Sequence, residues 1–214
     1  MTTATHDGLL LARLRVPLSQ DEEFNAWYNT EHLTQIGSVP GVLTARRYRA
    51  REGYPAWYLA MYELRSPAVY DSEEFRAVRD EPTPWSRRIA ALYGADRDVS
   101  VGRVLLTIGD PPTQAPSLFV ARMDVDASVD ADFNAWYSEE HVPLLAAVPG
   151  VLRVRRCVAH HGAPRYTTVY ELASPDVLDS VEWMTARERG RTIAMRALMR
   201  NVSKVMYSHV FTLK

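Results

Sequence analysis

The amino-acid sequence predicts an α+β protein made of two tandem ferredoxin-like βαββαβ units. One observation behind this prediction is an internal repeat, in which Phe24-Asn-Ala-Trp-Tyr28 recurs 109 positions later as Phe133-Asn-Ala-Trp-Tyr137. Self-similarity at a fixed spacing indicates a repeated structural unit. The other observation is that each copy alternates between strand-like and helix-like hydrophobic stretches in the order of a ferredoxin-like unit.

The repeat extends along most of the chain. Glu31-His32 recurs as Glu140-His141, and Val39-Pro-Gly-Val-Leu43 recurs as Val148-Pro-Gly-Val-Leu152. The offset falls to 108 further along and to about 101 at the last strand, which predicts about seven extra residues in the first copy. We therefore predict a first unit, a proline-rich linker and a second unit at residues 1–109, 110–117 and 118–214.

Each copy begins with a strand and a helix. In the first copy, apolar residues 9–16 predict the strand. Ser19-Gln-Asp-Glu22 has the pattern of a capping box, in which side chains satisfy free N–H groups at a helix start. We expect the helix to end near Ser38, because Pro40 cannot continue a helix and Gly41 accepts left-handed backbone angles.

Two strands, a second helical region and a last strand complete the copy. Ser66-Pro67 predicts the second helix start, with serine as N-cap and proline in the first helical position. The elements are expected at residues 42–49 (strand), 57–64 (strand), 66–93 (helical, interrupted at Pro82 and Pro84) and 101–108 (strand).

A ferredoxin-like unit covers one face of its sheet with two helices and leaves the other face to be buried elsewhere. Residues 57–64 alternate without a plainly polar face, which indicates burial on both sides. We therefore predict that the two sheets pack against each other as an intramolecular pseudo-dimer. Eight strands would enclose an interior wide enough for side chains or one small ligand. Exposed edge strands would also permit a homodimer.

Composition and charge exclude several classes of protein. The formal net charge is −1, so no overall basic field would attract nucleic acid or an anionic membrane. Cys157 is the single cysteine, which excludes an intrachain disulfide and fits a reducing compartment. No apolar run reaches the length of a membrane span, and the first residues lack the pattern of a signal peptide. These features predict a soluble cytoplasmic protein.

The first helix of each copy carries the candidate chemistry. On an ideal helix Asn25, Tyr28 and His32 share one stripe, and Asn134, Tyr137 and His141 repeat it in the second copy. Imidazole can transfer protons near neutral pH, and a phenol can polarise a carbonyl. We therefore predict His141, Tyr137, His32 and Tyr28 as catalytic residues, with the asparagines holding a substrate oxygen or the imidazole tautomer. The alternative is a hydrogen-bonded cluster inside the core or at an interface.

Neighbouring side chains are weaker candidates for substrate binding. Each has a structural alternative: core packing for the tryptophans, a network or ion pair for the glutamates, and an ion pair with Glu63 or Glu171 for the arginines. One arginine of each consecutive pair on a strand is expected to point inward, where it would hold an anion. The candidates are Trp27, Trp136, Glu31, Glu140, Arg47 and Arg156.

The motifs of common cofactor sites are missing from the sequence. It contains no GxGxxG, P-loop, CxxC or HExxH pattern. His160-His161 lies in an expected loop with too few companion residues for a metal site. Neither an organic cofactor nor a metal is expected.

One segment resembles a known family. Tyr137-Ser-Glu-Glu-His141-Val-Pro143-Leu144, followed by Val148-Pro149-Gly150, resembles the EthD-like branch of the dimeric α/β-barrel superfamily. The resemblance implies a fused, tandem version of what is usually a homodimer, and it implies that His141 and Tyr137 line a pocket. The first copy has Leu33-Thr34-Gln35 where the family has its Pro-Leu element, so the first pocket is expected to be degenerate or tuned differently.

The sequence leaves two classes of function open. The first is a cofactor-independent enzyme that acts on a small, largely apolar carbonyl or phenolic compound by proton transfer, as a cyclase, isomerase or decarboxylase. On the same scaffold, a substrate carbanion that reacts with O₂ would make the enzyme a monooxygenase. The second class is a non-catalytic protein that binds a small molecule or heme, because fold alone does not determine function.

Overall fold

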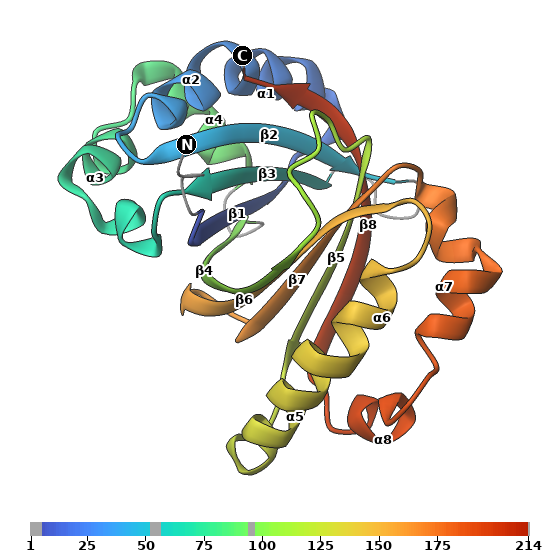
Figure 1. Cartoon of the computed structure of the whole chain (residues 1–214). Coiled ribbons are helices and arrows are strands. Elements are labelled where there is room, and N and C mark those ends of the chain that lie inside the picture. The colour runs from blue at the N-terminus through green and yellow to red at the C-terminus, as the bar shows by residue number, and fades with distance from the viewer. Residues whose placement is uncertain (1–5, 52–56, 94–96, 214) are drawn as a thin grey trace. The chain divides into compact units, whose positions relative to one another are not determined.

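The computed structural model describes residues 6–51, 57–93 and 97–213. The chain divides into two compact units (Figure 1). Unit 1 contains residues 1–103, 160–162 and 209–214, and unit 2 contains residues 104–159 and 163–208. Within the described residues, no helix has the length and apolar character needed to cross a membrane.

Unit 1 has the element order predicted for a ferredoxin-like unit. Its antiparallel sheet has the strand order β4-β1-β3-β2, in which the two central strands are the first and the third along the chain. The strands are β1 (Gly8–Arg15), β2 (Val42–Ala50), β3 (Trp57–Leu64) and the first part of β4 (Arg97–Ile108). The helical segments are η1 (Leu18–Gln20), α1 (Asp21–Trp27), η2 (Tyr28–His32), α2 (Leu33–Gly37), η3 (Pro67–Asp71), α3 (Glu73–Asp80) and α4 (Pro84–Tyr93).

Unit 2 repeats this order. Its antiparallel sheet has the strand order β8-β5-β7-β6. The strands are β5 (Ser117–Asp124), β6 (Val151–His161), β7 (Tyr166–Leu172) and β8 (Arg200–Thr212). The helical segments are η4 (Ala127–Val129), α5 (Asp130–Trp136), η5 (Tyr137–His141), α6 (Val142–Ala146), η6 (Pro175–Asp179), α7 (Val181–Ala186) and α8 (Thr192–Arg196). The predicted α+β class with two ferredoxin-like units is confirmed. Face-to-face packing of the two sheets stays a prediction.

Two local predictions are wrong. The capping box at residues 19–22 does not form, because the short turn η1 precedes α1 and places Ser19 inside a helical turn. The alignment of the last strands also shifts: Val99 lies opposite Ala12, and Lys204 lies opposite Ala121. Since Ala12 and Ala121 are equivalent, the last strands match at an offset of 105, so the first copy has about three extra residues rather than seven.

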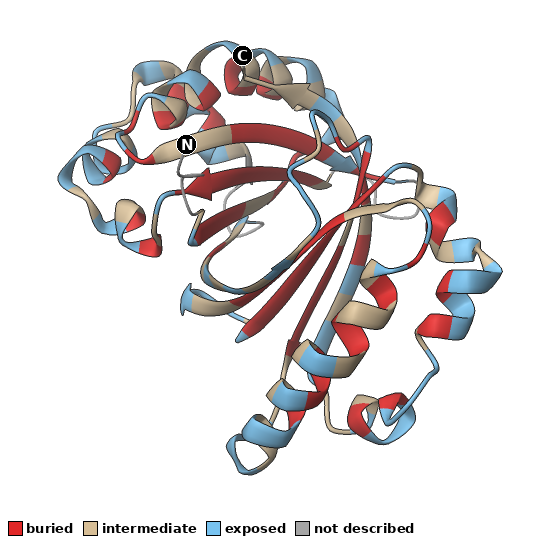
Figure 2. Ribbon diagram, viewed as in Figure 1, coloured by how far each residue is buried: buried red, intermediate tan, exposed pale blue. Residues whose placement is uncertain are grey.

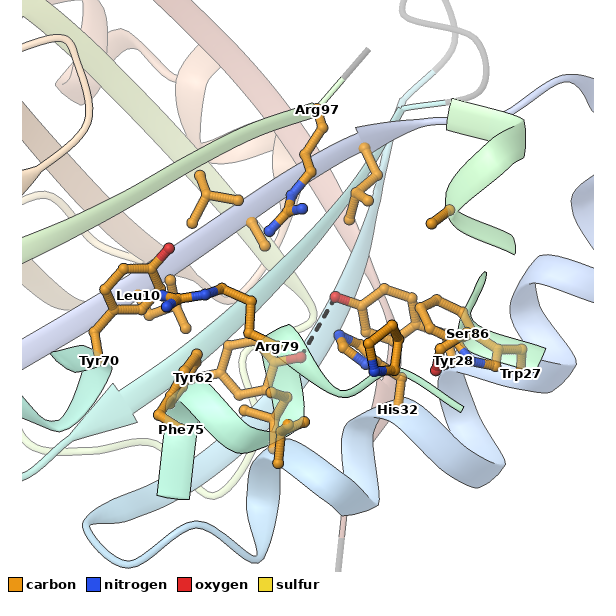
Figure 3. A pocket seen from close by; sticks show the side chains of 17 residues that line it. Leu10, Trp27, Tyr28, His32, Tyr62, Tyr70, Phe75, Arg79, Ser86 and Arg97 are labelled. Atoms are coloured by element: carbon orange, nitrogen blue, oxygen red, sulfur yellow. Dashed lines mark hydrogen bonds between the residues drawn. The ribbon is translucent and has the colours of Figure 1, made fainter. Parts of the chain in front are cut away.

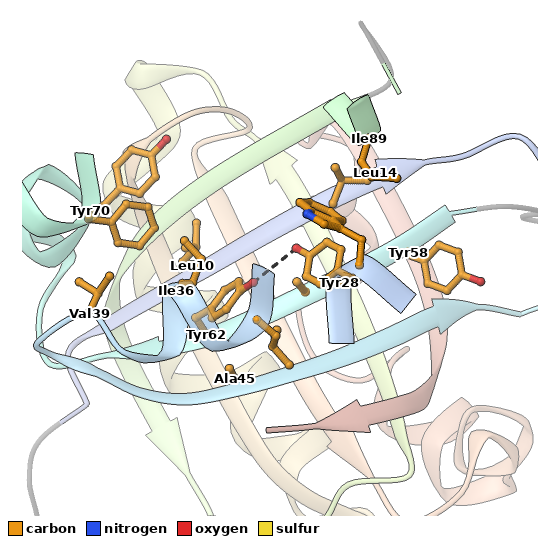
Figure 4. Packing of buried hydrophobic residues seen from close by; sticks show 14 of the residues in the cluster. Leu10, Leu14, Tyr28, Ile36, Val39, Ala45, Tyr58, Tyr62, Tyr70 and Ile89 are labelled. Carbon is orange, nitrogen blue, oxygen red and sulfur yellow. Dashed lines mark hydrogen bonds between the residues drawn. The ribbon is translucent and has the colours of Figure 1, made fainter. Parts of the chain in front are cut away.

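Each unit has a core between its helices and its own sheet. In Figure 2 the helices of unit 1 are buried along one side and exposed along the other, as amphipathic helices are. The core of unit 1 gathers aromatic rings from η2, β3 and η3, among them Tyr28, Tyr58, Tyr62 and Tyr70 (Figure 4). Phe24 of α1 belongs to the same core. Phe133, Tyr137, Tyr166, Tyr170 and Trp183 belong to the corresponding core of unit 2. Turns with φ of 97° at Gly41 and 89° at Gly150 end the first helices, as the sequence predicts.

The opposite face of each sheet carries buried ion pairs. Arg46 Nη1 lies 3.5 Å from Glu63 Oε1 in unit 1. In unit 2, Arg153 Nε and Arg155 Nη2 lie 2.7 and 2.9 Å from Glu171 Oε1. All five residues are buried. One arginine of each consecutive pair, Arg46 or Arg155, therefore forms the ion pair that the sequence offers as the structural alternative.

Candidate functional site

The first helix of each unit contains one wide turn. Residues 28–32 of η2 and 137–141 of η5 form π-helical turns, so that Leu33 N–H donates to the Tyr28 carbonyl and Val142 N–H to the Tyr137 carbonyl. Such i→i+5 turns occur often at functional sites. The extra residue rotates the helix before the turn by roughly 100° relative to the helix after it. Asn25 therefore leaves the stripe that contains Tyr28 and His32.

In unit 1 the wide turn borders a cavity between the helices and the sheet. The cavity has a volume of about 160 Å³ and is lined by Tyr28 and His32 together with Trp27. In Figure 3 these three side chains lie near one another, Tyr70 and Arg79 lie toward the other end, and Arg97 reaches in from β4. Pro82, Ser86 and Ala90, which lie in and just before α4, also line the cavity.

Unit 2 has a larger cavity at the equivalent place. Its volume is about 450 Å³, and Tyr137 and His141 line it. The helix that follows α7 is shorter here, since α8 has five residues where α4 has ten. The other lining residues are Phe119, Ala121, Met123, Leu145, Tyr170, Leu178, Asp179, Trp183, Met184, Arg187, Thr192, Arg196, Met199 and Lys204.

The imidazole of each unit packs against aromatic rings. His32 stacks on Trp27 with ring centroids 4.6 Å apart, and its ring lies 4.9 Å from that of Tyr28. His141 lies 4.8 Å from the ring of Trp136 and 5.1 Å from that of Tyr137. His141 is 9% exposed, and its Nδ1 has no hydrogen-bond partner in the described part of the chain. No described side chain therefore fixes its tautomer through that atom.

This packing keeps both imidazoles neutral. Burial, together with the positive charges of Arg97 and Arg47, lowers the pKa of His32 to about 4. Burial also lowers the pKa of His141 to about 4, with Arg196 and Lys204 as the next causes. A neutral imidazole can accept a proton at physiological pH. Each cavity therefore holds a proton acceptor beside a phenol.

The phenols are held by hydroxyl groups on β3 and β7. Tyr28 Oη lies 3.4 Å from Tyr62 Oη. In unit 2, Thr168 Oγ1 donates to Tyr137 Oη at 3.4 Å. Burial raises the pKa of Tyr137 above its ordinary value. The phenol of Tyr137 therefore keeps its proton and can donate it to an oxygen in the cavity.

The predicted asparagines and inward arginines lie outside the cavity linings. Arg47 Nη2 donates to Asn25 Oδ1 at 2.9 Å, and the guanidinium lies 4.3 Å from the ring centroid of Tyr28. Arg156 Nη2 likewise donates to Asn134 Oδ1 at 2.7 Å. Each arginine thus lies beneath the first helix and supports the tyrosine ring from outside the cavity. The structure does not bring these four residues together with the imidazoles at a common surface.

The predicted glutamates and tryptophans differ between the units. Glu31 Oε1 accepts hydrogen bonds from Trp27 Nε1 (3.1 Å), Thr83 Oγ1 (2.6 Å) and Ser86 Oγ (3.1 Å). Among the described residues, the side-chain partner of Glu140 is Arg191, whose Nε lies 3.4 Å away in an exposed contact. Trp136 is buried outside the lining of its cavity, and its Nε1 has no hydrogen-bond partner among the described residues.

Sequence reasoning did not single out the charged lining of unit 2. Arg187 directly follows α7, Arg196 is the last residue of α8, and Lys204 lies in β8. Tyr62 and Tyr170 carried a usable signal, because Tyr62-Glu-Leu64 recurs as Tyr170-Glu-Leu172. Lys204 carried none, because the corresponding residue of unit 1 is Val99.

Comparison with solved structures supports the ferredoxin-like fold of the chain. No protein-family model matches the sequence, and no curated protein matches it. A solved protein from Fusobacterium nucleatum, provisionally named a monooxygenase, superimposes with a TM-score of 0.68 and 8% identity over 98% of this chain and 95% of that one.

Two other solved structures share the fold. An anthrone oxidase-like protein has a TM-score of 0.66 and 13% identity over 98% of this chain and 93% of its own. A heme-degrading enzyme from Listeria monocytogenes has a TM-score of 0.50 and 10% identity over 95% of this chain and 99% of its own. These likenesses establish the fold of the chain.

Proposed function

We propose that the chain is an enzyme that removes a proton from a small, largely apolar carbonyl or phenolic compound, with unit 2 as its main site. The observation that carries the proposal is a cavity of about 450 Å³ lined by a neutral imidazole and a protonated phenol. Cavities of roughly 300–1,000 Å³ hold small-molecule ligands. The cavity of unit 1, at about 160 Å³, is close to the roughly 150 Å³ that holds one benzene ring.

The chemistry follows from the lining. His141 accepts a proton from a carbon next to the substrate carbonyl, and the electron pair of the broken C–H bond moves onto the carbonyl oxygen. Tyr137 then donates a hydrogen bond to the resulting enolate, as a preorganised donor does in a water-poor site. Arg156 holds the Tyr137 ring at 4.8 Å from outside the cavity. Return of the proton at another position gives isomerisation. Attack of the enolate carbon on a second carbonyl of the same molecule, with the proton passing to that carbonyl's oxygen, gives cyclisation.

Reaction of the same enolate with O₂ is the second candidate. The fold shared with an anthrone oxidase-like protein favours testing it, because anthrone is an apolar ketone with an acidic C–H bond. Oxidation consumes one O₂ for each anthrone and yields anthraquinone and water. The initial proton transfer to His141 is the same for both outcomes.

Anthrone in deuterated buffer is therefore a suitable first probe. Under argon, we expect the protein to accelerate exchange of the methylene hydrogens, measured by proton NMR, and His141→Ala to lower that acceleration by about 100-fold or more. His32→Ala is the matched control and should change the rate by less than about twofold, since a cavity near the size of one benzene ring excludes three fused rings. Unchanged exchange in the double variant would remove the proposed role of the imidazoles.

Air and hemin separate the remaining alternatives. Oxygen uptake with anthraquinone formation, lost in His141→Ala, would assign the chain to the monooxygenases. A Soret band after mixing with hemin that disappears in the histidine variants would favour heme binding. Binding of anthrone without exchange or oxidation would favour a non-catalytic binding protein. Mass spectrometry of small molecules retained during purification would identify a natural ligand.

The proposal includes the origin and setting of the chain. The repeat at an offset of 109 supports origin by tandem duplication and fusion, and the Tyr-x-x-x-His-x-Pro-Leu stretch at Tyr137–Leu144 supports a relationship to the EthD-like branch. A pseudo-dimer within one chain, a cytoplasmic location and a small-molecule partner belong to the same proposal. Size-exclusion chromatography with light scattering tests for a further homodimer.

A further inference from the structure

The cavity of unit 2 has a charged end that the proposed proton transfer does not use. Lys204 lies on β8 opposite Ala121, and both residues line the cavity. The same register position in unit 1 is Val99, opposite Ala12, and both of those line the smaller cavity. Equivalent strand positions thus place a cation at one cavity and an apolar side chain at the other.

Positive charge exceeds negative charge around this end. Three cationic residues line the cavity: Arg187, Arg196 and Lys204. Glu188 pairs with Arg196 at 3.1 Å and with Arg187 at 3.0 Å. Asp179, also in the lining, is the other carboxylate, which leaves one positive charge in excess. The side chain of Lys204 has no ion pair or hydrogen bond to any described side chain.

The other lining residues are mostly aromatic and apolar. Phe119 and Trp183 meet edge to face with ring centroids 5.9 Å apart, and Met199 and Leu178 also line the cavity. A volume of about 450 Å³ is roughly three times the 150 Å³ that holds one benzene ring. The cavity therefore has room for two or three fused rings, with a cationic group at one end.

We propose that the cavity of unit 2 binds a carboxylate of two or three fused aromatic rings, with the carboxylate on Lys204 and Arg196 and the rings against Phe119 and Trp183. This inference deepens the proposed function and rests on it for the role of the compound as substrate. Lysine and arginine both donate charge-assisted hydrogen bonds to carboxylates. An anion bound there also offsets the positive charges beside His141.

Compensation of these positive charges by a bound carboxylate has a chemical consequence. Arg196 and Lys204 help to keep the pKa of His141 low, while Glu188 raises it and Arg187 lowers it. A bound carboxylate contributes negative charge beside the same groups, so the pKa of His141 rises when the ligand enters. The imidazole becomes a stronger proton acceptor only in the occupied cavity.

Two probes of matched shape test the charge requirement. Anthracene-2-carboxylate and its neutral carboxamide are titrated against the full chain, with binding followed by anthracene fluorescence. We expect the carboxylate to bind about ten times more tightly, because a hydrogen bond to a charged group is stronger than one to a neutral group. Lys204→Val, which copies unit 1, should abolish that difference without changing carboxamide affinity, and Lys204→Arg should retain it.

Controls separate this inference from the proposed function. Arg97→Ala alters the charge of the other cavity and should leave both affinities unchanged. His141→Ala should still bind the carboxylate, so loss of turnover in that variant does not bear on the anion site. In NMR titrations of the His141 ring, the carboxylate should raise the pKa and the carboxamide should leave it unchanged.

Three results would overturn the inference. The first is equal affinity of the chain for the two probes. The second is an equal loss of carboxylate and carboxamide affinity in Lys204→Val with an unchanged melting temperature. The third is that neither probe binds at its solubility limit. Selective loss of carboxylate binding in Arg97→Ala would also contradict it, since that result would place the anion in unit 1.

Discussion

The two cavities share their chemical groups and differ in what closes them. Both have a tyrosine and a histidine from a π-helical turn. In unit 1, α4 covers the end of the cavity near Trp27, and Ser86 from α4 bonds to Glu31. In unit 2, α8 is half as long, the side chain of Glu140 is 42% exposed, and the cavity is nearly three times as large.

This difference shows how a repeated unit can separate structural from binding roles. The tyrosine and histidine at each cavity are positioned by the local sequence of the first helix of the unit. The volume in front of them depends on a different segment, which begins about fifty residues later in unit 1. A few residues gained or lost there change a binding site without changing the candidate chemical groups.

The largest expected effect concerns what the two cavities share. Each imidazole has a pKa of about 4 in the folded chain against an ordinary value of 6.5. The unfolded chain therefore binds more protons between these values. The stabilising contribution is complete above pH 6.5 and is lost as pH falls toward 4. Within that window, each decrease of one pH unit should lower the unfolding free energy by about 1.4 kcal/mol for each imidazole.

Urea unfolding at pH 7, 6 and 5 measures this slope. His32→Gln and His141→Gln should each flatten it by a similar amount, and the double variant should combine the two effects because the rings belong to separate units. A slope that the double variant leaves unchanged would show that neither imidazole is held neutral by folding. A change confined to one variant would show that the cavities differ in their shared groups as well as in their closure.

The next effect distinguishes the units. Glu31→Ala removes the acceptor of three hydrogen bonds, so we expect a loss of about 2–3 kcal/mol of unfolding free energy. Glu140→Ala removes one exposed contact and should cost less than about 0.5 kcal/mol. Chemical unfolding at pH 7 measures both. Equal losses would mean that Glu140 belongs to a comparable network and that the two closures are alike.

The fold and part of each candidate site could be predicted from the sequence. The fold followed from the repeat and from hydrophobic periodicity, because residues 57–64 and 166–172 are strands buried along nearly their whole length. The pairing of Tyr28 with His32 also followed, since both lie within one helical turn. These features depend on spacing that is local in the chain.

Features that depend on longer-range geometry were missed. Asn25 was placed beside His32 on an ideal helix, and the wide turn rotates it toward Arg47 instead. Lys204 reaches a cavity only because β8 is paired in one particular register with β5. The cavities lie between helices and sheet within each unit, whereas the sequence pointed to the barrel interior. None of these features has a signature in a single stretch of residues.

The smallest expected effect tests the closure at one atom. Trp27 Nε1 donates to Glu31 and to Ser86, both at 3.1 Å, whereas the buried Trp136 Nε1 has no partner in the described part of the chain. Phenylalanine removes the N–H group in either unit, together with a similar loss of apolar contact. Trp27→Phe should therefore cost about 1 kcal/mol more than Trp136→Phe, because only the first breaks hydrogen bonds. Chemical unfolding of both variants gives the difference, and Glu31→Ala in the same background should reduce it. Equal costs would mean that Trp136 Nε1 finds a partner in solution, such as a water molecule, so that the two helices are satisfied alike and differ only in the volume in front of them.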